Sequence, residues 1–580
     1  MKKVLSYFKG YKLECILGPL FKLFEATLEL IVPLLIARII DEGITLCDPV
    51  MIVRDCLWLL ALGVVGLVFS ITAQYFCARA AVGGITKMRS ALFTHLGSLS
   101  YTEIDKLGTS TMITRITADA NQVQSGVNLA LRLLLRSPFV VFGAMIMACL
   151  INVTATGTID YEISGIFGLT ILVLSVIVFG IMLITMPLYK KVQGRLDGVV
   201  RKTRENLGGA RVIRAFCKEG DECREFESRN SNLTATQKLV GRISALMNPL
   251  TYIVINVAIV LLIYTGAIKV STGELSAGQV VALYNYMSQI LVELIKLASL
   301  IITITKSFAS ASRISDVFDV KSSMVEGERE CGIGAEYIVE LEGATLTYAS
   351  AQQPSIEDVS IKVRRGETVG IIGGTGAGKT SLINLIPRFY DATAGSVKID
   401  GVDVREYTYR ALRSRIGIVP QKATLFRGTV RDNLMIGAPC ATDEDMLYAL
   451  EVAQALDFVD EKGGLDAMIE EGGKNLSGGQ RQRLTIARAL ASRPEILILD
   501  DSASALDLAT DAALRRALCE KTDATVFIVS QRTASIMHAD AIIVLEDGRC
   551  ESLGTHDELL SSSTVYREIY LSQFAEEVAK

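Results

Sequence analysis

Residues 373–380 read Gly-Gly-Thr-Gly-Ala-Gly-Lys-Thr. An apolar β-rich run, 367–372, comes before this stretch, and a run of helix-forming residues, 379–385, follows its glycines. A glycine-rich turn between a strand and a helix fits the P-loop, in which backbone N–H groups and the start of the helix close on phosphate oxygens. The stretch predicts phosphate binding by Gly373, Gly374, Thr375, Gly376, Ala377, Gly378, Lys379, Thr380 and Ser381.

A second stretch, Ile496 to Asp500, is an apolar strand that ends in a carboxylate. Alone, such a strand is more often part of a buried sheet than part of a site. Downstream of a P-loop it predicts a Mg²⁺ site made by Thr380 and Asp500, with Lys379 reaching the β and γ phosphates of ATP. Tyr348 is expected to stack on adenine, although a tyrosine that ends a strand commonly only packs.

The chain ahead of this domain has a different character. Half of the 580 residues are hydrophobic and the mean hydropathy is +0.38, which is too apolar for an ordinary soluble protein. Several stretches approach the roughly 20 apolar residues that a helix needs to cross a bilayer. They predict six membrane spans, at about 14–40, 57–80, 131–151, 166–188, 248–268 and 277–305.

These observations predict a multi-domain fold. An all-α six-helix transmembrane domain at 1–320 is followed by a linker at 321–336 and by an α/β nucleotide-binding domain at 337–580. The polar segments between spans two and three, and between spans four and five, are rich in helix formers. The spans are therefore expected to continue as long cytoplasmic helices.

Lysine and arginine concentrate on one side of the predicted spans. Four lysines precede the first span and eight basic residues lie at 190–214, whereas the loops after spans one and five carry only Arg54 and Lys269. The positive-inside rule then places both termini and the nucleotide-binding domain in the cytoplasm. The net charge of −4 gives no reason to expect nucleic acid, and the eleven cysteines show no paired metal-ligand spacing.

Residues 476–480 read Leu-Ser-Gly-Gly-Gln, directly before a helical run that begins at Arg481. With this stretch the chain resembles an ATP-binding cassette (ABC) transporter, over its whole length. The order of a six-span domain and then a cassette is similar to that of the exporter half-transporters. The resemblance implies that Gln421 is the Q-loop residue, with catalytic and Mg²⁺-binding roles, and that 504–507 form the D-loop.

In this family two cassettes meet head to tail, and each ATP lies between the P-loop of one and the signature of the other. The resemblance therefore implies that Ser477, Gly478, Gly479 and Gln480 bind the ATP of a second half-transporter. The start of the signature helix agrees with this role, because it is an anion site with no phosphate of its own chain to bind.

Two positions depart from the family pattern. Asp501 stands where a catalytic glutamate follows Asp500, and Gln531 stands where a switch histidine is usual. Aspartate reaches about 1 to 1.5 Å less far than glutamate, and a misplacement of that size can cost about a hundredfold in rate. Gln531 can donate a hydrogen bond to a γ phosphate but carries no positive charge. One change would indicate a slow but functional site.

Two changes beside an intact signature favour a specialised degenerate site. The resemblance then narrows to the bacterial heterodimeric multidrug-type exporters, in which the intact signature of the degenerate half completes the competent site of the other half. ATP is expected to bind well here and to be hydrolysed weakly.

Ionisable side chains inside the predicted spans are candidates for substrate contact, because they are costly in a bilayer unless they face protein or water. Lys22, Glu25 and Glu29 share one helical face of the first span, and Glu293 and Lys296 lie three apart in the last. A cavity-lining role would suit amphipathic or cationic cargo. Ion pairs that only stabilise packing are the equal alternative. Asn256, Tyr284 and Gln289 are weaker candidates.

The expected function is ATP-driven export of hydrophobic or amphipathic compounds across the cytoplasmic membrane by one half of a heterodimer. A homodimeric exporter with slow hydrolysis and an ATP-gated channel or regulatory membrane protein are the alternatives. The resemblance also implies coupling helices near 110–118 and 208–216 that transmit cassette closure to the spans. Drug, lipid, peptide and siderophore exporters share these motifs, so the motifs do not choose the cargo.

Overall fold

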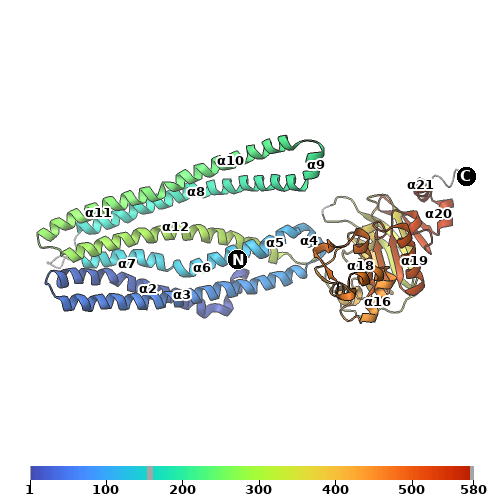
Figure 1. Ribbon diagram of the computed structural model, residues 1–580, viewed down its shortest axis with the longest axis horizontal. Helices are drawn as coiled ribbons and strands as arrows, with labels where there is room; N and C mark the ends of the chain where they lie inside the picture. Colours follow the sequence, from blue (N-terminus) through green and yellow to red (C-terminus); the bar gives the residue numbers. More distant parts are fainter. Residues whose placement is uncertain (1, 153–160, 350, 575–580) are drawn as a thin grey trace. The chain divides into compact units, whose positions relative to one another are not determined.

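The computed structural model describes residues 2–152, 161–349 and 351–574 (Figure 1). They form two compact units. The first comprises Met1–Gly97 and Thr109–Val320, and the second comprises Ser98–Gly108 and Lys321–Lys580. The second unit thus takes a short segment, 98–108, from within the stretch that otherwise forms the first.

The first unit is entirely helical in its described residues (Figure 1). Its elements are α1 (Lys2–Ser6), η1 (Lys9–Tyr11), α2 (Lys12–Arg38), η2 (Ile39–Ile44), α3 (Pro49–Gly97), α5 (Thr109–Thr114), η3 (Arg115–Asp119), α6 (Ala120–Leu133), α7 (Arg136–Ile151), α8 (Tyr161–Gly208), α9 (Ala210–Ala215), α10 (Glu219–Ala245), α11 (Met247–Ser271) and α12 (Ala277–Asp319).

Five stretches of the described helices are long and apolar enough to cross a membrane. They are Pro49–Gly97, Thr109–Ile151, Tyr161–Gly208, Glu219–Ser271 and Ala277–Asp319, and each contains one of the predicted spans. The remaining predicted span, 14–40, corresponds to α2. This helix has 27 residues, which is sufficient length, but it carries three ionisable residues near its centre. Its role as a sixth span stays a prediction.

Small residues line the contacts between the membrane helices. Ala26 of α2, Ala73 and Ala80 of α3 and Ala144 of α7 are completely buried, whereas large apolar residues such as Trp58 point outward. Helices in a bilayer gain little from burying apolar surface against one another, so close backbone approach at small residues is what holds them together. The outward apolar side chains agree with a lipid-facing surface.

The second unit is built on a six-stranded sheet of order β12-β11-β3-β10-β9-β6. Its strands are β3 (Thr368–Gly373), β6 (Ile416–Val419), β9 (Ile496–Asp500), β10 (Thr525–Val529), β11 (Ala541–Glu546) and β12 (Arg549–Gly554). All pairings are parallel except that of β11 with β12. Every residue of β9 and β10 is buried, as expected for strands covered on both faces. The predicted α/β nucleotide domain with a largely parallel sheet is confirmed.

A four-stranded antiparallel sheet of order β2-β1-β4-β5 lies in the same unit. Its strands are β1 (Tyr337–Leu346), β2 (Ile356–Arg364), β4 (Ala394–Ile399) and β5 (Val402–Asp403), and a short pair is formed by β7 (Gly428–Thr429) and β8 (Met468–Ile469). The helices are α4 (Tyr101–Leu107), α13 (Lys379–Leu385), α14 (Tyr409–Arg413), α15 (Val430–Gly437), α16 (Asp443–Val452), α17 (Leu456–Glu461), η4 (Gly464–Asp466), η5 (Glu471–Gly473), α18 (Gly478–Leu490), α19 (Leu508–Lys521), η6 (Thr533–Ser535), α20 (His556–Ser562) and α21 (Thr564–Gln573).

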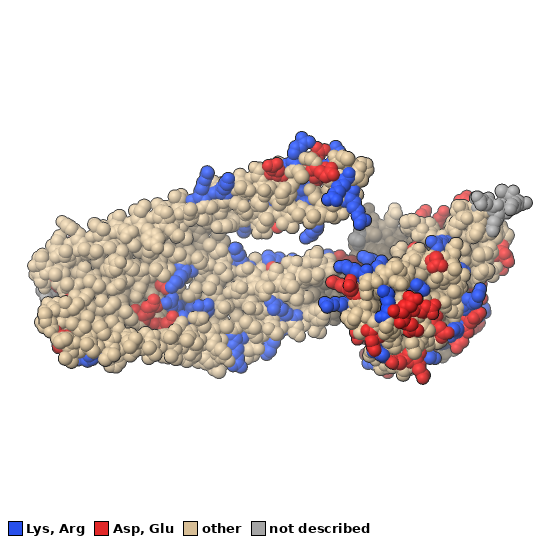
Figure 2. Space-filling view, viewed as in Figure 1, with Lys and Arg blue, Asp and Glu red and all other residues tan. Residues whose placement is uncertain are grey.

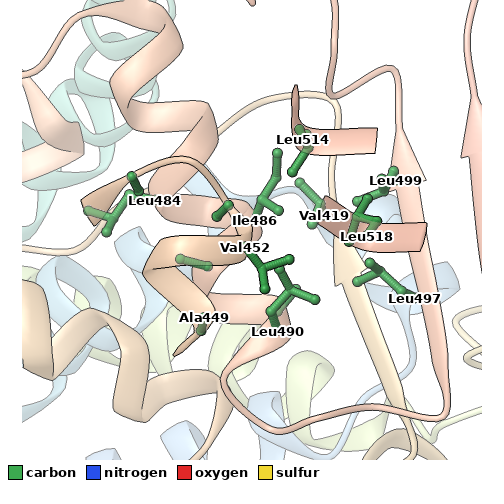
Figure 3. Packing of buried hydrophobic residues seen from close by; sticks show 14 of the residues in the cluster. Val419, Ala449, Val452, Leu484, Ile486, Leu490, Leu497, Leu499, Leu514 and Leu518 are labelled. Carbon is green, nitrogen blue, oxygen red and sulfur yellow. The ribbon is translucent and has the colours of Figure 1, made fainter. Parts of the chain in front are cut away.

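The hydrophobic core of this unit fixes the strand ends that carry polar residues. Leu497 and Leu499 of β9 pack in one cluster with Ile486 of α18 and Leu518 of α19 (Figure 3). Because β9 is locked on this face by two helices, the carboxylate at its end, Asp500, has little freedom to shift. The core therefore positions the site described below.

The segment taken from the helical stretch packs through aromatic residues. The ring of Tyr101 in α4 lies 4.8 Å from that of Phe389, and the Tyr390 hydroxyl donates a hydrogen bond of 2.7 Å to Asp105. Residues 110–118, where a coupling helix is expected, belong to α5 and η3 of the helical unit, and their contact with a cassette stays a prediction. α4 is thus the part of this intervening stretch that the structure joins to the nucleotide-binding unit.

Candidate functional site: the nucleotide cleft

The P-loop connects β3 to α13 in a conformation that requires glycine. Gly376 and Gly378 have φ values of +87° and +92°, in the left-handed region. A Cβ on Gly378 would also lie 2.4 Å from the Ser355 carbonyl oxygen. Lys379 begins α13, and its Nζ donates hydrogen bonds of 2.8 and 2.7 Å to the carbonyls of Gly373 and Gly374. The Lys379 side chain therefore lies along the P-loop.

One cleft brings together many of the predicted nucleotide residues, although Gly373, Gly374 and Ala377 are not among those that line it. It is lined by Ser355, Thr375, Gly376, Gly378, Lys379, Thr380, Ser381, Gln421, Asp500, Asp501, Val529, Ser530 and Gln531. These residues come from the P-loop, from the loop after β6 and from the ends of β9 and β10. The carboxyl ends of neighbouring parallel strands meet at one edge of the sheet, which is where ligands of such folds bind.

Burial sets the electrostatics of the cleft. Asp500 is 5% exposed, and this burial raises the pKa of its carboxyl above the usual range. Burial likewise lowers the pKa of the Lys379 ammonium, against the opposing effect of Asp501 and Asp500. The Asp500 carboxylate and the Lys379 ammonium are thus poorly solvated in the cleft. A bound cation would stabilise the carboxylate, and bound phosphate would stabilise the ammonium.

The residues present fit a magnesium ion. The Thr380 hydroxyl lies 3.3 and 3.2 Å from the two carboxylate oxygens of Asp500, and the side chain of Gln421 lines the same cleft. Among the described residues no group of three or more His, Cys, Asp and Glu side chains gathers into a metal site. A hydroxyl with one carboxylate is the sparse oxygen set that suits Mg²⁺, which takes its remaining ligands from phosphates and water.

The two unusual residues both lie in the cleft. Asp501 has a φ of +44°, and its backbone N–H donates a hydrogen bond of 3.0 Å to the Val529 carbonyl. Its carboxylate is 3.4 Å from Nε2 of Gln421, an amide donor that faces the cleft. The backbone is therefore fixed from β10, and the short side chain reaches the Q-loop residue.

Gln531 is held through its backbone by the C-terminal helix. Nε2 of Gln573, the last residue of α21, donates a hydrogen bond of 2.7 Å to the Gln531 carbonyl. Oε1 of the same amide accepts from the N–H and the hydroxyl of Thr533, both at 2.9 Å. One side chain from the end of the chain thus ties down the loop that carries position 531, while the Gln531 side chain is exposed.

Tyr348 is placed beside the P-loop helix but not among the residues that line the cleft. Its hydroxyl donates a hydrogen bond of 3.0 Å to Ser381 Oγ, and its ring meets Tyr390 edge to face at 5.0 Å. Sequence reasoning missed Tyr390. The only signal was its position in an aromatic pair, 389–390, soon after the P-loop helix.

The signature residues do not belong to this cleft. Ser477 is the exposed N-cap of α18, where its hydroxyl accepts from the Gln480 backbone N–H at 3.2 Å and Gln480 Oε1 accepts from the Ser477 N–H at 3.0 Å. This capping box leaves the next N–H groups, at Gly478 and Gly479, without intrahelical partners. The N–H groups of Gly478 and Gly479 are therefore free to donate to an anion, and binding of a partner's ATP there stays a prediction.

The membrane helices join three of the ionisable residues, Glu29, Glu293 and Lys296, into a network with an arginine that sequence reasoning missed. Arg136, the first residue of α7, donates to Glu29 at 2.6 Å and to Glu293 at 2.7 Å. Lys296 donates to the same Glu293 oxygen at 2.8 Å. Lys22 pairs with Glu25 in α2. Arg136 could have been found, because it lies inside the span predicted at 131–151.

Comparison with known proteins agrees with both units. Residues 15–294 match the family described as ABC transporter transmembrane region, and residues 356–504 match the family described as ABC transporter. An uncharacterised ABC transporter ATP-binding protein of Mycobacterium tuberculosis is 36% identical over 562 residues, covering 96% of this chain and 95% of its own. The chain therefore belongs to the ABC transporter family, with the membrane and ATP-binding regions in one polypeptide.

Two further relatives mark the exporter branch. A putative multidrug export ATP-binding/permease protein of Bacillus subtilis is 30% identical, with 99% of each chain covered. The solved structure of a bacterial Atm1-family ABC exporter with ATP bound has a TM-score of 0.81 and covers 97% of this chain and 100% of its own, at 22% identity. At that identity the structural likeness shows a shared fold.

Proposed function

We propose that the chain is the degenerate-site half of a heterodimeric exporter, which uses ATP to move hydrophobic or amphipathic compounds out of the cytoplasm across the inner membrane. The observation that carries the proposal is the meeting of Asp501 and Gln531 in one cleft with Lys379, Thr380 and other residues of the P-loop. Both residues act on the same step, the polarisation of the attacking water, while the groups that bind ATP and Mg²⁺ are all present.

Different residues of the chain bind the phosphates, the adenine and the Mg²⁺ ion of Mg-ATP. Lys379 and the P-loop N–H groups bind the β and γ phosphates, and Tyr348 stacks on the adenine once its ring turns from Ser381. Thr380, Asp500 and Gln421 would hold Mg²⁺, which would neutralise charge on the phosphate oxygens. The Asp501 side chain is too short to take a proton efficiently from water at the γ phosphate. ATP therefore stays bound here for a long time and is hydrolysed slowly.

The exposed signature supports a second chain. The N–H groups at the start of α18 attract a phosphate. The Ser477 hydroxyl can also give up its capping hydrogen bond and donate to a phosphate oxygen. Members of this family work as dimers, so the signature would complete the ATP site of a partner that carries the glutamate and the histidine. Hydrolysis at that site then drives transport, with both cassettes in the cytoplasm where ATP is available.

The test is to identify the partner. The tagged chain would be extracted gently from its native membrane, and proteins of similar size that co-purify in equal amount would be identified by mass spectrometry. We expect a second half-transporter with Glu after its Mg-binding Asp and with a switch His. Recovery of this chain alone as a dimer would refute the heterodimer and would mean that the site with Asp501 and Gln531 carries out the hydrolysis.

A second candidate function is an ATP-gated channel or regulatory membrane protein, in which binding of ATP is the signal. Weak hydrolysis at this cleft favours it as much as it favours a degenerate exporter half. Flux through the purified complex separates the two, because only a pump moves its compound against a concentration gradient and stops when hydrolysis stops.

A further inference from the structure

We propose that the membrane helices hold a binding site for the anionic group of an amphipathic compound, a carboxylate or phosphate carried on an apolar body. The inference rests on the export function proposed above and names the class of cargo. The site is formed by what we call the membrane charge cluster, whose members are Lys22, Glu25, Glu29, Arg132, Arg136, Glu293 and Lys296. Acidic and basic side chains gather at one place on the helical unit within an uncharged surround (Figure 2).

Three helices that pack on one another supply the cluster. α2 contributes residues spaced three and four apart, and α12 contributes Gln289, Glu293 and Lys296 at similar spacing. α6 and α7 contribute Arg132 and Arg136, which lie one helical turn apart in the continuous stretch Thr109–Ile151. α2, α12 and the α6–α7 stretch all contact one another, so these three faces converge.

Most of the charges in the cluster neutralise one another. Glu293, only 3% exposed, accepts from Arg136, from Lys296 and from the Ser137 hydroxyl at 2.8 Å. Lys22 is paired with Glu25 and also donates to Ser70 at 3.1 Å. Glu29 accepts from Arg136. Each of the three carboxylates therefore has a cationic partner within the cluster.

One cation is left over. Arg132 forms no ion pair or hydrogen bond with the residues that the structure describes, although it is partly buried. Four cationic side chains thus face three carboxylates, and the cluster carries a net charge of +1. An uncompensated positive charge among membrane helices is unfavourable and marks a place where an anion is expected to bind.

Unmet hydrogen-bonding capacity lies on the same faces. Buried polar atoms without partners in the described chain include Nε of Arg132 and Arg136, and the amide oxygens of Asn128 and Gln289. Asn128 is one turn before Arg132, and Gln289 is one turn before Glu293. The guanidinium Nε groups can only donate, and an amide can turn its NH₂ toward an acceptor. A carboxylate or phosphate is the acceptor-only group that satisfies these donors.

Access to the cluster comes from its two half-exposed members. The side chains of Glu29 and Lys296 are both 41% exposed, whereas those of Arg136 and Glu293 are 8% and 3% exposed. A charged headgroup can therefore reach Lys296, and Arg132 is itself only partly buried, whereas Arg136 and Glu293 are enclosed. The apolar surface around the cluster suits the hydrocarbon body of an amphipathic compound.

This assignment differs from the cationic cargo that acidic residues in α2 and α12 suggest. Those carboxylates are already neutralised by Arg136 and Lys296, so they have no net attraction left for a cation. The unpaired Arg132 makes the net charge of the cluster positive, so the cluster is expected to attract an anion. Its position was visible in the sequence, but its lack of a partner was not.

The test uses three probes that share one pyrene-labelled alkyl chain and differ only in the headgroup: carboxylate, neutral alcohol or trimethylammonium. The chain with its co-purified partner would be reconstituted into phosphatidylcholine vesicles, and ATP-dependent movement of each probe would be followed by its protection from an impermeant quencher. We expect the carboxylate probe to be moved with the highest kcat/KM.

Three variants connect that preference to the cluster. Arg132→Gln should lower the ratio of carboxylate to trimethylammonium transport about tenfold, because it removes the unpaired charge. Glu29→Gln should raise the ratio, since it adds net positive charge and leaves Arg136 paired with Glu293. Arg201→Gln is the matched control: Arg201 is exposed on α8, outside the cluster, and its loss should leave the ratio unchanged.

Each outcome has a definite meaning. A wild-type complex that prefers the trimethylammonium probe, or an Arg132→Gln complex with the wild-type ratio, overturns the anion site while leaving amphipath export intact. Absence of ATP-dependent movement for all three probes overturns the export function instead. Adding phosphatidylglycerol to the vesicles separates the sources of the anion: competition with the carboxylate probe identifies a lipid headgroup as an occupant, and no competition assigns the site to non-lipid amphipathic anions.

Discussion

The nucleotide cleft and the membrane charge cluster both place carboxylates beside cations, but they are built differently. The cleft gathers its residues from a tight loop and from the ends of parallel strands, and its Lys379 donates to backbone carbonyls of its own loop. The cluster has no backbone scaffold of this kind. Side chains from α2, α7 and α12 hold one another, and Arg136 alone joins two carboxylates that lie 264 positions apart, at Glu29 and Glu293.

The difference shows where the stability of each site lies. In the cleft, the shape comes from the backbone of the glycine turn and the sheet edge, and the buried Asp500 opposes folding until a cation arrives. In the cluster, the charges support one another directly. Removing Arg136 breaks a buried ion pair, which costs much more than the loss of an exposed pair.

The largest expected effect is on the cluster. Arg136→Leu should lower the free energy of unfolding by about 3–5 kcal/mol, because it leaves Glu29 without its cationic partner and leaves the buried Glu293 with Lys296 alone. The matched control is Lys521→Met, which breaks an exposed pair with Glu451 of the same 2.7 Å length and should cost no more than about 1 kcal/mol. Unfolding by detergent titration measures both. Equal effects would show that the cluster is solvated like a surface pair.

The next effect concerns the chemistry of the cleft. Asp501→Glu combined with Gln531→His should raise ATP turnover at this site about a hundredfold, by restoring the reach of the carboxylate and the charge of the imidazole. ATP hydrolysis by the purified pair would be measured. The double variant Asp501→Asn with Gln531→Asn is the control and should give no gain. If the restored variant leaves turnover unchanged, these two positions do not limit the site.

A smaller effect is expected on nucleotide affinity. Tyr348→Ala should weaken ATP binding about 5- to 150-fold, since stacking on a base contributes about 1–3 kcal/mol. Tyr348→Phe keeps the ring, loses only the bond to Ser381, and should stay within about threefold of wild type. Binding of a fluorescent ATP analogue measures both. Equal losses in the two variants would mean that the hydroxyl matters more than the ring.

The smallest effect tests how much burial of the Asp500 carboxylate destabilises the folded nucleotide-binding unit. Because burial raises the pKa of Asp500, the folded state holds that proton more tightly than the unfolded state, and folding stability falls as pH rises through the folded pKa. Asp500→Asn should therefore raise the thermal midpoint of the nucleotide-free protein at neutral pH, and the gain should vanish in acid. The same variant should lose the stabilisation that Mg²⁺ with ATP gives to wild type. Thermal unfolding across pH checks both results.

The contrast between the two sites also explains what the sequence could predict. The P-loop and the apolar strand ending at Asp500 are contiguous motifs whose local geometry dictates their use, so the α/β fold and the phosphate and Mg²⁺ residues of the cleft were predicted from them. Gln421, Asp501 and Gln531 were assigned from the family resemblance. The cluster depends on how three helices pack. Lys22, Glu25 and Glu29 were visible as one helical face, but the pairing of Glu29 with Arg136 required the tertiary structure.

Two other features were beyond sequence reasoning for a similar reason. The segment 98–108 groups with the nucleotide-binding unit through aromatic contacts at Phe389 and Tyr390, which no periodicity indicates. The hydrogen bond from the Gln573 side chain to the Gln531 carbonyl joins residues that lie 42 positions apart. A single glutamine in a C-terminal helix belongs to no sequence motif, so this bond could not be predicted.

That amide has a practical consequence for how the protein is handled. Gln573 is the last residue of α21, and the loop with Gln531 depends on it for three hydrogen bonds. Shortening the chain before this residue, or replacing the residue itself, would release the loop and change the kinetics of the cleft without touching any residue that meets ATP. Any shortening of the carboxyl terminus therefore has to stop after Gln573, and cleavage by proteases before this residue would resemble a catalytic defect.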